Sequence, residues 1–236
     1  ADNDYLLMAT LFQQKAAERR ALSYQAFNIA KLRLDDELRK ARLTKTLAII
    51  VDIDETVLDN SPFEAKSIIE NSDYPVHWDE WCTAAKARPL AGSVDFLNYA
   101  KSKGVIVYYI TNRKIHLLDV TLKNLKLEGF PYADKDHVLM KTDDSNKDAR
   151  RNIVEANHHI VLFMGDNLGD FMHVFDDKNI DERFSLTDKY KNEFGNKFIV
   201  LPNPMYGSWA NELINNNYDL SKEEKIELLK KQLIDF

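Results

Sequence analysis

The sequence predicts an α/β fold in which helices flank a Rossmann-like parallel sheet, together with a small and mostly helical cap. Continuous apolar runs rich in β-branched residues are typical of strands that are buried on both faces. Helix-like stretches separate several of these runs, and this alternation indicates parallel strands joined by helices. The expected strands occupy residues 46–52, 105–111, 137–140, 160–166 and 197–203.

Helices are expected at both ends of the chain. Residues 4–43 predict one or two amphipathic helices, because apolar or small residues recur there close to helical spacing. They are Phe12, Ala16, Phe27, Ala30, Leu34 and Leu38. Ser221 and Glu224 have the spacing of a capping box, which predicts the start of a final helix. One face of that helix is marked by Ile226, Leu229 and Leu233.

A segment at residues 63–88 interrupts the alternation between the first strand and a helix expected near 92–103, and we interpret it as a cap or lid. The chain is long enough for one domain with a substantial core. We therefore expect a single domain divided into a core at about 44–62 and 88–236 and a cap at about 1–43 and 63–87.

Composition excludes several classes of partner. The net charge of −6 argues against a nucleic-acid polymer, which needs a basic face, but a small phosphorylated ligand remains compatible with it. Cys82 is the only cysteine, so no intramolecular disulfide and no cysteine-based zinc site are possible. No apolar run approaches the roughly 20 residues of a membrane span, and the first residues lack a signal-peptide pattern. We expect a cytosolic protein or one from which an export signal has been removed.

Polar residues collect where the expected strands end. Ligands bind at the carboxyl ends of the strands in open α/β sheets, so these residues are expected to share one edge. They are Asp52, Asp54, Thr111, Asn112, Lys141, Asp166 and Asp170.

The aspartates of this group suit phosphate chemistry with a metal. Carboxylate oxygens are preferred ligands of Mg²⁺, and Asp52 and Asp166 form the natural pair for it. Aspartate can act as a covalent nucleophile that forms an aspartyl-phosphate, a role that one carboxylate of this pair would fill. Asp54 could then give a proton to the leaving alcohol and later activate water.

A phosphoryl group also needs hydrogen-bond donors around its oxygens. Thr111 can supply a hydroxyl, and either Lys141 or Lys147 can supply an ammonium group. Spacing alone does not separate the two lysines. Tyr206, in the stretch "LPNPMYGSWA", either stacks on a planar substrate group or packs in a turn.

Two motifs resemble those of a known family. The stretches "IIVDIDETVLDNSPF" (49–63) and "IVLFMGDNLGDF" (160–171) are similar to the signatures of the bacterial class C acid phosphatases, typified by lipoprotein e. This family belongs to the haloacid dehalogenase (HAD) superfamily, within the group that carries four motif aspartates. The resemblance extends over nearly the whole chain and implies the HAD fold.

The resemblance implies a role for each motif residue. Asp52 resembles the nucleophile, and Asp54 resembles the general acid and base whose backbone carbonyl also binds Mg²⁺. Asp166 resembles the direct metal ligand, and Asp170 the aspartate that holds metal-bound water. The motif hydroxyl corresponds to Thr111. Within "SNK", the motif lysine corresponds best to Lys147.

The resemblance also implies substrates. Family members hydrolyse phosphomonoesters, and several favour 5′-nucleotides whose base lies between aromatic side chains. Tyr206 and Tyr74 would fill that role, with Asn112 as a further candidate substrate-binding residue. Phe63 stands where the family usually has tyrosine, so one hydroxyl is absent from the surroundings of the site.

The resemblance also implies a cellular location. Family members are typically exported to the cell surface or outer membrane, and many carry a lipid on an N-terminal cysteine that this sequence lacks. The sequence therefore resembles a mature or trimmed lipoprotein, and family analogy suggests a homodimer. Two alternatives stay open: a binding or storage protein for haem or another planar ligand on the same scaffold, and a phosphotransferase that passes the phosphoryl group to an alcohol.

Overall fold

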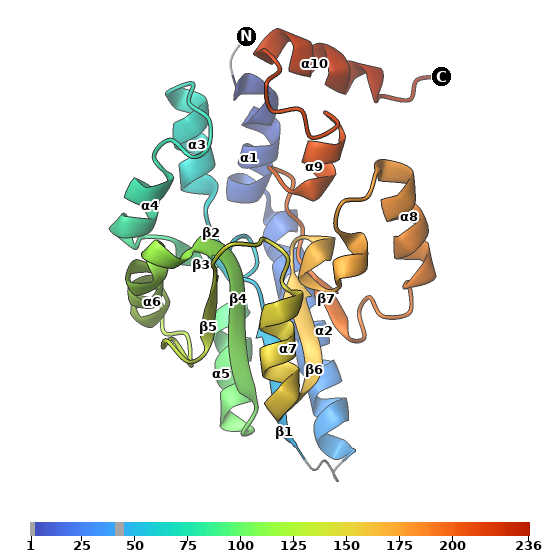
Figure 1. Ribbon diagram of the computed structural model, residues 1–236. Helices are drawn as coiled ribbons and strands as arrows, with labels where there is room; N and C mark the ends of the chain where they lie inside the picture. The colour runs from blue at the N-terminus through green and yellow to red at the C-terminus, as the bar shows by residue number, and fades with distance from the viewer. Residues whose placement is uncertain (1–2, 41–44) are drawn as a thin grey trace.

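A five-stranded parallel sheet forms the centre of the computed structural model, which describes residues 3–40 and 45–236 (Figure 1). The strand order is β5-β4-β1-β6-β7, and every neighbouring pair is parallel. The strands are β1 (Thr46–Val51), β4 (Ile106–Lys114), β5 (Val138–Lys141), β6 (His158–Gly165) and β7 (Phe198–Val200). The expected fold class is thus confirmed.

Helices cover both faces of this sheet (Figure 1). The α-helices are α1 (Leu7–Lys15), α2 (Ala17–Arg39), α3 (Ser61–Ile69), α4 (Trp78–Ala84), α5 (Ser93–Ser102), α6 (Leu118–Leu127), α7 (Asp148–Asn157), α8 (Ile180–Lys189), α9 (Ser208–Glu212) and α10 (Lys222–Lys231). Short 3₁₀ turns are η1 (Asn3–Leu6), η2 (Ile115–Leu117), η3 (Leu168–Asp170) and η4 (His173–Phe175).

The alternation of side chains along β1 divides the core into two layers. Successive residues of a strand point to opposite faces of the sheet. Ile49 and Val51 pack in the layer under α2, α5 and α6, whereas Ala48 and Ile50 pack with Val154 of α7 on the other face. These last four side chains of β1 are all buried, which explains why this part of the strand is a continuous apolar run.

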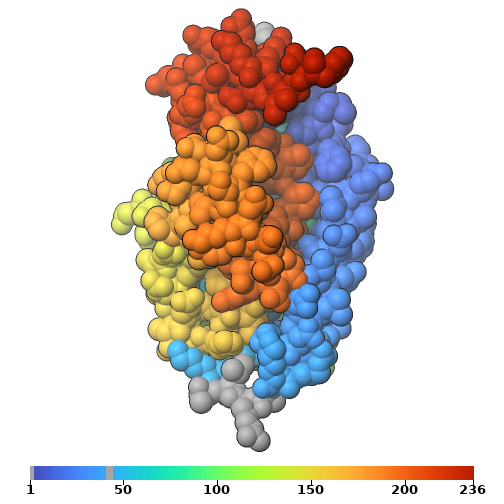
Figure 2. Space-filling view, turned by 90° about the vertical axis from the view of Figure 1, so that its right-hand side faces the viewer, coloured from blue at the N-terminus to red at the C-terminus, as the bar shows by residue number. Residues whose placement is uncertain are grey.

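The N-terminal segment contains two consecutive helices that meet at Ala16, whose backbone is extended. Phe27, Ala30 and Leu34 are buried on α2, which contacts α5, β6 and β7. Figure 2 shows α2 running along one side of the face that α8, α9 and α10 form. The second half of the segment expected as part of the cap therefore lies against the sheet, and the boundary expected at residues 43–44 lies outside the described residues.

The 63–88 insertion lies beyond the carboxyl ends of the strands and contains α4 and most of α3 (Figure 1). A short antiparallel ladder between β2 (Leu58–Asp59) and β3 (Arg88–Pro89) joins its two ends. Such a ladder brings the chain back to the sheet close to where it left, so the insertion can be added without disturbing the parallel core.

Several element boundaries differ from the expectation. The strand expected to end at Thr111 continues to Lys114, and the strand expected to reach residue 203 ends at Val200, two residues before Pro202, which has no N–H for a strand ladder. The capping box of α10 is present, but the helix ends at Lys231, so Leu233 lies beyond it and is exposed. None of the helices in the described part of the chain is long and apolar enough to cross a membrane.

Candidate active site

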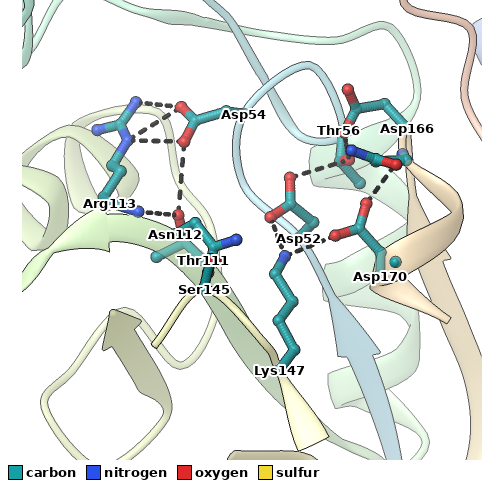
Figure 3. Close-up of polar contacts among 12 residues, drawn as sticks. Asp52, Asp54, Thr56, Thr111, Asn112, Arg113, Ser145, Lys147, Asp166 and Asp170 are labelled. Atoms are coloured by element: carbon teal, nitrogen blue, oxygen red, sulfur yellow. Dashed lines mark hydrogen bonds and ion pairs between the residues drawn. The ribbon is translucent and has the colours of Figure 1, made fainter. Parts of the chain in front are cut away.

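Three carboxylates meet at the carboxyl edge of the sheet (Figure 3). Asp52 follows β1 directly, Asp166 follows β6 directly, and Asp170 ends the short turn η3. One oxygen from each of the three side chains lies within 4.8 Å of the others. Because β1 and β6 are neighbours in the sheet, their ends bring the first two aspartates together, and the turn after β6 adds the third.

Lys147 provides the counter-charge for this cluster. Its Nζ atom lies 2.5 Å from Oδ1 of Asp52 and 2.7 Å from Oδ1 of Asp170. The side chain is buried and comes from the residue that precedes α7. Lys141, the other candidate, is the last residue of β5 and makes no ion pair or side-chain hydrogen bond with any described residue. The structure thus places Lys147, and not Lys141, beside Asp52.

The crowding of these carboxylates changes their acidity. Burial raises the pKa of Asp52 to about 7, with Lys147 opposing the shift and Asp170 and Asp54 adding to it. Burial and the neighbouring Asp170 and Asp52 raise the pKa of Asp166 well above its usual value. A divalent cation would offset this repulsion, and a set of carboxylate oxygens is the donor chemistry that Mg²⁺ prefers. The residues present therefore fit a site for a divalent metal ion.

Neighbouring polar groups hold the cluster in place. The Thr56 hydroxyl lies 3.3 Å from both Asp52 and Asp166, and the Asn203 amide donates to Asp166 at 2.8 Å. The backbone N–H of Asn167 donates to Asp170 at 2.9 Å. These contacts fix the carboxylate orientations, as the partners of metal ligands generally do.

Asp54 belongs to a second group of polar contacts (Figure 3). Its carboxylate accepts hydrogen bonds from Arg113 at 2.8 and 3.0 Å and from the side-chain amide of Asn60 at 2.8 Å. The Thr111 hydroxyl lies 3.4 Å from it. Asp54 and Thr111, which were both predicted as site residues, are therefore in contact through their side chains.

Arg150 of α7 links two segments that border the site. Its guanidinium donates to the Thr111 carbonyl at 2.5 Å and to the Asn112 side chain at 2.7 Å. It also donates to the carbonyls of Ser145 and Asn146 at 3.2 Å, just before Lys147. Asn112 itself is exposed, and its side-chain oxygen is occupied by this bond. Arg150 therefore holds the loop that precedes Lys147 against β4.

Tyr206 lies beside a buried carboxyl group. The half-buried Tyr206 side chain donates its hydroxyl hydrogen to Glu55, which also accepts from the backbone N–H of Asn60 at 2.6 Å. Burial, together with Asp54 and Asp166, raises the pKa of Glu55 well above its usual value. The tyrosine is thus anchored to the loop that follows Asp54.

The other predicted aromatic, Tyr74, lies in the cap. It is exposed, and its ring packs edge-on against Trp78 with centroids 6.0 Å apart. Phe63 contacts the same indole at 5.1 Å. Trp81 reaches the site network directly, because its indole N–H donates to Asn60 at 2.8 Å. The aromatic group of the insertion therefore packs on itself and borders the polar network.

Several residues of this site were not predicted from the sequence. Arg113 was not predicted because the strand was expected to end at Thr111. Residues i and i+2 of a strand share a face, so the position of Thr111 could have indicated Arg113. Asp52 and Asp54 form a D-x-D pair. Thr56, Asn60 and Glu55 follow this pair but lie in irregular structure, where no periodicity predicts which side chains turn inward. Asn203 carried no signal of its own.

Comparisons with known proteins identify the family of this chain. Residues 3–209 match the family described as HAD superfamily, subfamily IIIB (acid phosphatase). Two crystal structures of the class C acid phosphatase from Bacillus anthracis, one with tungstate bound, are each 46% identical to the chain, with a TM-score of 0.96 over 99% of this chain and 98% of that one.

A more distant relative is the stem 31 kDa glycoprotein of Glycine max, which is 28% identical over 164 residues. The match covers 66% of this chain and 58% of the glycoprotein, so the chain spans a little over half of that relative. The family match and the full-length structural similarity confirm the resemblance that the two motifs indicate. The chain therefore belongs to subfamily IIIB of the HAD superfamily, the acid phosphatases, a family of phosphomonoesterases.

Proposed function

We propose that the protein is a Mg²⁺-dependent acid phosphatase that hydrolyses phosphomonoesters, including 5′-nucleotides, through a covalent aspartyl-phosphate on Asp52. The observation that carries this proposal is the group formed by Asp52, Lys147, Asp166 and Asp170 at the carboxyl edge of the sheet. It combines a nucleophile, a fixed cation and the ligands for a metal in one place.

The metal would be held by Asp52, Asp166 and Asp170, with the Asp54 carbonyl as a further ligand suggested by family resemblance. When bound, Mg²⁺ supplies positive charge that lowers the cost of bringing a phosphate dianion to three carboxylates. It would also keep Asp52 ionised, because a nearby cation opposes the upward pKa shift that burial imposes on this group.

The two aspartates of the D-x-D pair then have different roles: Asp52 is the nucleophile, and Asp54 is the general acid and base. An oxygen of Asp52 forms a bond to phosphorus while the bond between phosphorus and the ester oxygen breaks, and Asp54 gives its proton to the departing alcohol. Asp54 then removes a proton from water as the water oxygen bonds to phosphorus and the bond between phosphorus and the Asp52 oxygen breaks. Phosphate leaves, and both aspartates return to their starting states.

Donors for the phosphoryl oxygens lie on both sides of Asp52. Lys147 is already within 2.5 Å of Asp52, and Thr111 lies in the last part of the neighbouring strand β4. Tungstate, a tetrahedral oxyanion like phosphate, is bound in one of the Bacillus anthracis structures, which supports an oxyanion site in this family. We assign the phosphate contacts to Thr111 and Lys147.

The nucleoside of a 5′-nucleotide would pack against Tyr206. Base stacking on an aromatic ring tolerates different bases, because every base presents a π-face. Tyr206 is half-buried and held by Glu55 next to Asp54, so its ring is fixed on the leaving-group side of the site. Tyr74 would supply the second, more exposed aromatic surface from the cap.

The proposal is tested by phosphate release from a 5′-mononucleotide, a 3′-mononucleotide and 4-nitrophenyl phosphate, at acidic and neutral pH, with Mg²⁺ and with excess chelator. We expect release from the 5′-nucleotide and the aryl ester that chelator abolishes and added Mg²⁺ restores. Asp52→Asn should reduce release to background while its circular dichroism spectrum stays that of the wild type. Metal-independent release, or normal turnover by Asp52→Asn, would contradict the proposal.

A further inference from the structure

Arg113 is an almost completely enclosed cation beside Asp54, with only 1% of its side chain exposed. Its Nε atom donates to both oxygens of Asp54, at 3.0 and 3.2 Å, and its Nη2 atom donates to Oδ1 of Asp54 at 2.8 Å. Nη2 also lies 3.4 Å from the Asn60 side-chain oxygen. A guanidinium that donates from two nitrogens to one carboxylate fixes its direction as well as its charge.

The guanidinium is itself fixed from two other sides. Its Nη1 atom donates to the Thr121 hydroxyl of α6 at 3.2 Å. Its central carbon lies 5.5 Å from the centre of a ring of Trp78, a cation–π arrangement with the cap helix α4. Arg113, on β4, therefore contacts both α6 and the cap, and the same guanidinium binds Asp54.

The contacts distinguish the two oxygens of Asp54. Oδ1 accepts three close bonds: 2.8 and 3.0 Å from Arg113 and 2.8 Å from the Asn60 amide. Among the described residues, Oδ2 has two longer contacts, 3.2 Å from Arg113 and 3.4 Å from the Thr111 hydroxyl. An oxygen that already accepts three close donors cannot also carry a proton without losing one of those bonds, so Oδ2 is the oxygen with capacity for a proton.

We infer that Arg113 is a positioning residue for Asp54: it anchors Oδ1 and leaves Oδ2 as the oxygen that exchanges the proton with the leaving alcohol and with water. This inference rests on the proposed function, in which Asp54 is the general acid and base. In the first step, the proton on Oδ2 moves to the ester oxygen as the bond between phosphorus and that oxygen breaks. In the second, Oδ2 takes a proton from the water that attacks phospho-Asp52.

The consequence is a dependence on the leaving group. 4-Nitrophenolate is a stable anion and departs without a proton, whereas a simple alkoxide departs only if it is protonated. The parameter kcat/KM reports on steps up to the first irreversible one, here formation of the phosphoenzyme. The ratio of kcat/KM for an alkyl phosphate to kcat/KM for 4-nitrophenyl phosphate therefore measures how well Asp54 delivers its proton.

The experiment compares this ratio in five Mg²⁺-loaded proteins besides the wild type: Arg113→Met, Arg113→Lys, Asp54→Asn, the double variant Arg113→Met with Asp54→Asn, and Arg183→Met. Arg183 is a matched control, because it is also buried but donates to the Phe175 carbonyl instead of Asp54. A thermal melt of each variant establishes that it is folded. If Arg113→Met does not fold, Arg113→Lys, which keeps the charge but loses the planar fork, decides the outcome.

We expect Arg113→Met to lower the ratio by about tenfold or more, Arg113→Lys to lower it less, and Arg183→Met to leave it unchanged. Because Arg113 acts through Asp54, the double variant should have the same ratio as Asp54→Asn alone. An unchanged or increased ratio in the Arg113 variants, alongside a lowered ratio in Asp54→Asn, overturns the inference and leaves the proposed function intact. An unchanged ratio in Asp54→Asn overturns the proposed acid role, and the inference with it.

Discussion

Gly165 lies so close to Asp170 that a Cβ atom placed on it would fall 2.3 Å from the carboxylate oxygen Oδ2. Real side chains do not approach so closely, so the glycine is required by space at this position. The same carboxylate oxygen accepts the N–H of Asn167, and the other receives Lys147. The last residue of β6 therefore determines where the third carboxylate of the cluster can lie.

Gly165→Ala should displace Asp170 and weaken Mg²⁺ binding. Disturbing the surroundings of a metal ligand typically costs 10- to 100-fold in affinity, so we expect the Mg²⁺ concentration for half-maximal activity to rise by about tenfold. A titration of activity with Mg²⁺ measures this. Gly104→Ala is the control: its Cβ would meet nothing within 4 Å, but its φ of +76° makes the substitution strained. It should lower stability by about 1 kcal/mol and leave the Mg²⁺ titration unchanged.

Lys147→Met and Lys141→Met should show which of the two lysines acts in the reaction, a question that the spacing in the sequence left open. Lys147 contacts Asp52 and Asp170, so its loss removes the fixed cation beside the reacting phosphate, and kcat should fall by about 100-fold or more. Lys141 has no such contact, and its variant should stay within about twofold of the wild type. Steady-state kinetics with 4-nitrophenyl phosphate measure both, and equal losses would contradict the assignment of Lys147.

Tyr206→Ala should weaken nucleotide binding selectively. Loss of base stacking, worth about 1–3 kcal/mol, should raise KM for a 5′-mononucleotide by about tenfold and leave KM for a small alkyl phosphate nearly unchanged. Tyr206→Phe keeps the ring but removes the donor to Glu55, so it should retain the nucleotide KM and lose about 1 kcal/mol of stability. Tyr218→Ala, at an exposed tyrosine near the C-terminus, serves as the control. Equal KM increases for both substrates would contradict a stacking role.

Glu64 of α3 should make stability depend on pH. Burial raises its pKa from 4.5 to about 7 in the folded protein. Between these values the folded state binds more protons than the unfolded state, so the free energy of unfolding falls as pH rises from about 4.5 to 7. The loss is on the order of 2 kcal/mol, discounted for the partial exposure of the side chain.

Glu64→Gln removes this ionisation and should therefore raise the free energy of unfolding at pH 8 with little effect at pH 4. Urea unfolding at both pH values measures the change. Glu155→Gln, at an exposed glutamate of α7, is the matched control and should change neither value by more than about 0.5 kcal/mol. If Glu64→Gln changed the free energy of unfolding equally at pH 4 and pH 8, burial of the carboxylate would not be the cause.

The sheet could be predicted from the sequence because its two central strands, β1 and β6, are buried on both faces over most of their length. β1 and β6 are continuous apolar runs, and the aspartates that follow them had to meet once the strands were neighbours. The boundaries were harder to predict. β4 extends past Thr111 to Lys114 because its pairing with β5 resumes at Lys114, opposite Lys141, after an irregularity that follows Ile110, and a search for apolar runs cannot detect this.

The supporting contacts of the site could not be predicted, for a different reason. Arg113, Asn60 and Arg150 meet their partners across sequence separations of 59, 6 and 39 residues in three different kinds of element. Their partnerships depend on side-chain directions in turns and at helix starts, which a periodic pattern does not encode. The aspartates were accessible to sequence reasoning because they lie at strand ends.

The position of β1 between β4 and β6 has a consequence for how activity is lost. Its backbone is hydrogen-bonded along both edges, and the Asp52 N–H is bonded to the Met164 carbonyl at 2.9 Å. In hydrogen–deuterium exchange these amides should be the slowest of the molecule, opening only when the whole domain unfolds, whereas the cap helices can open locally. The nucleophile thus belongs to the last cooperative unit to unfold. A partly unfolded molecule would keep Asp52 in place but would no longer bind the substrate through the cap.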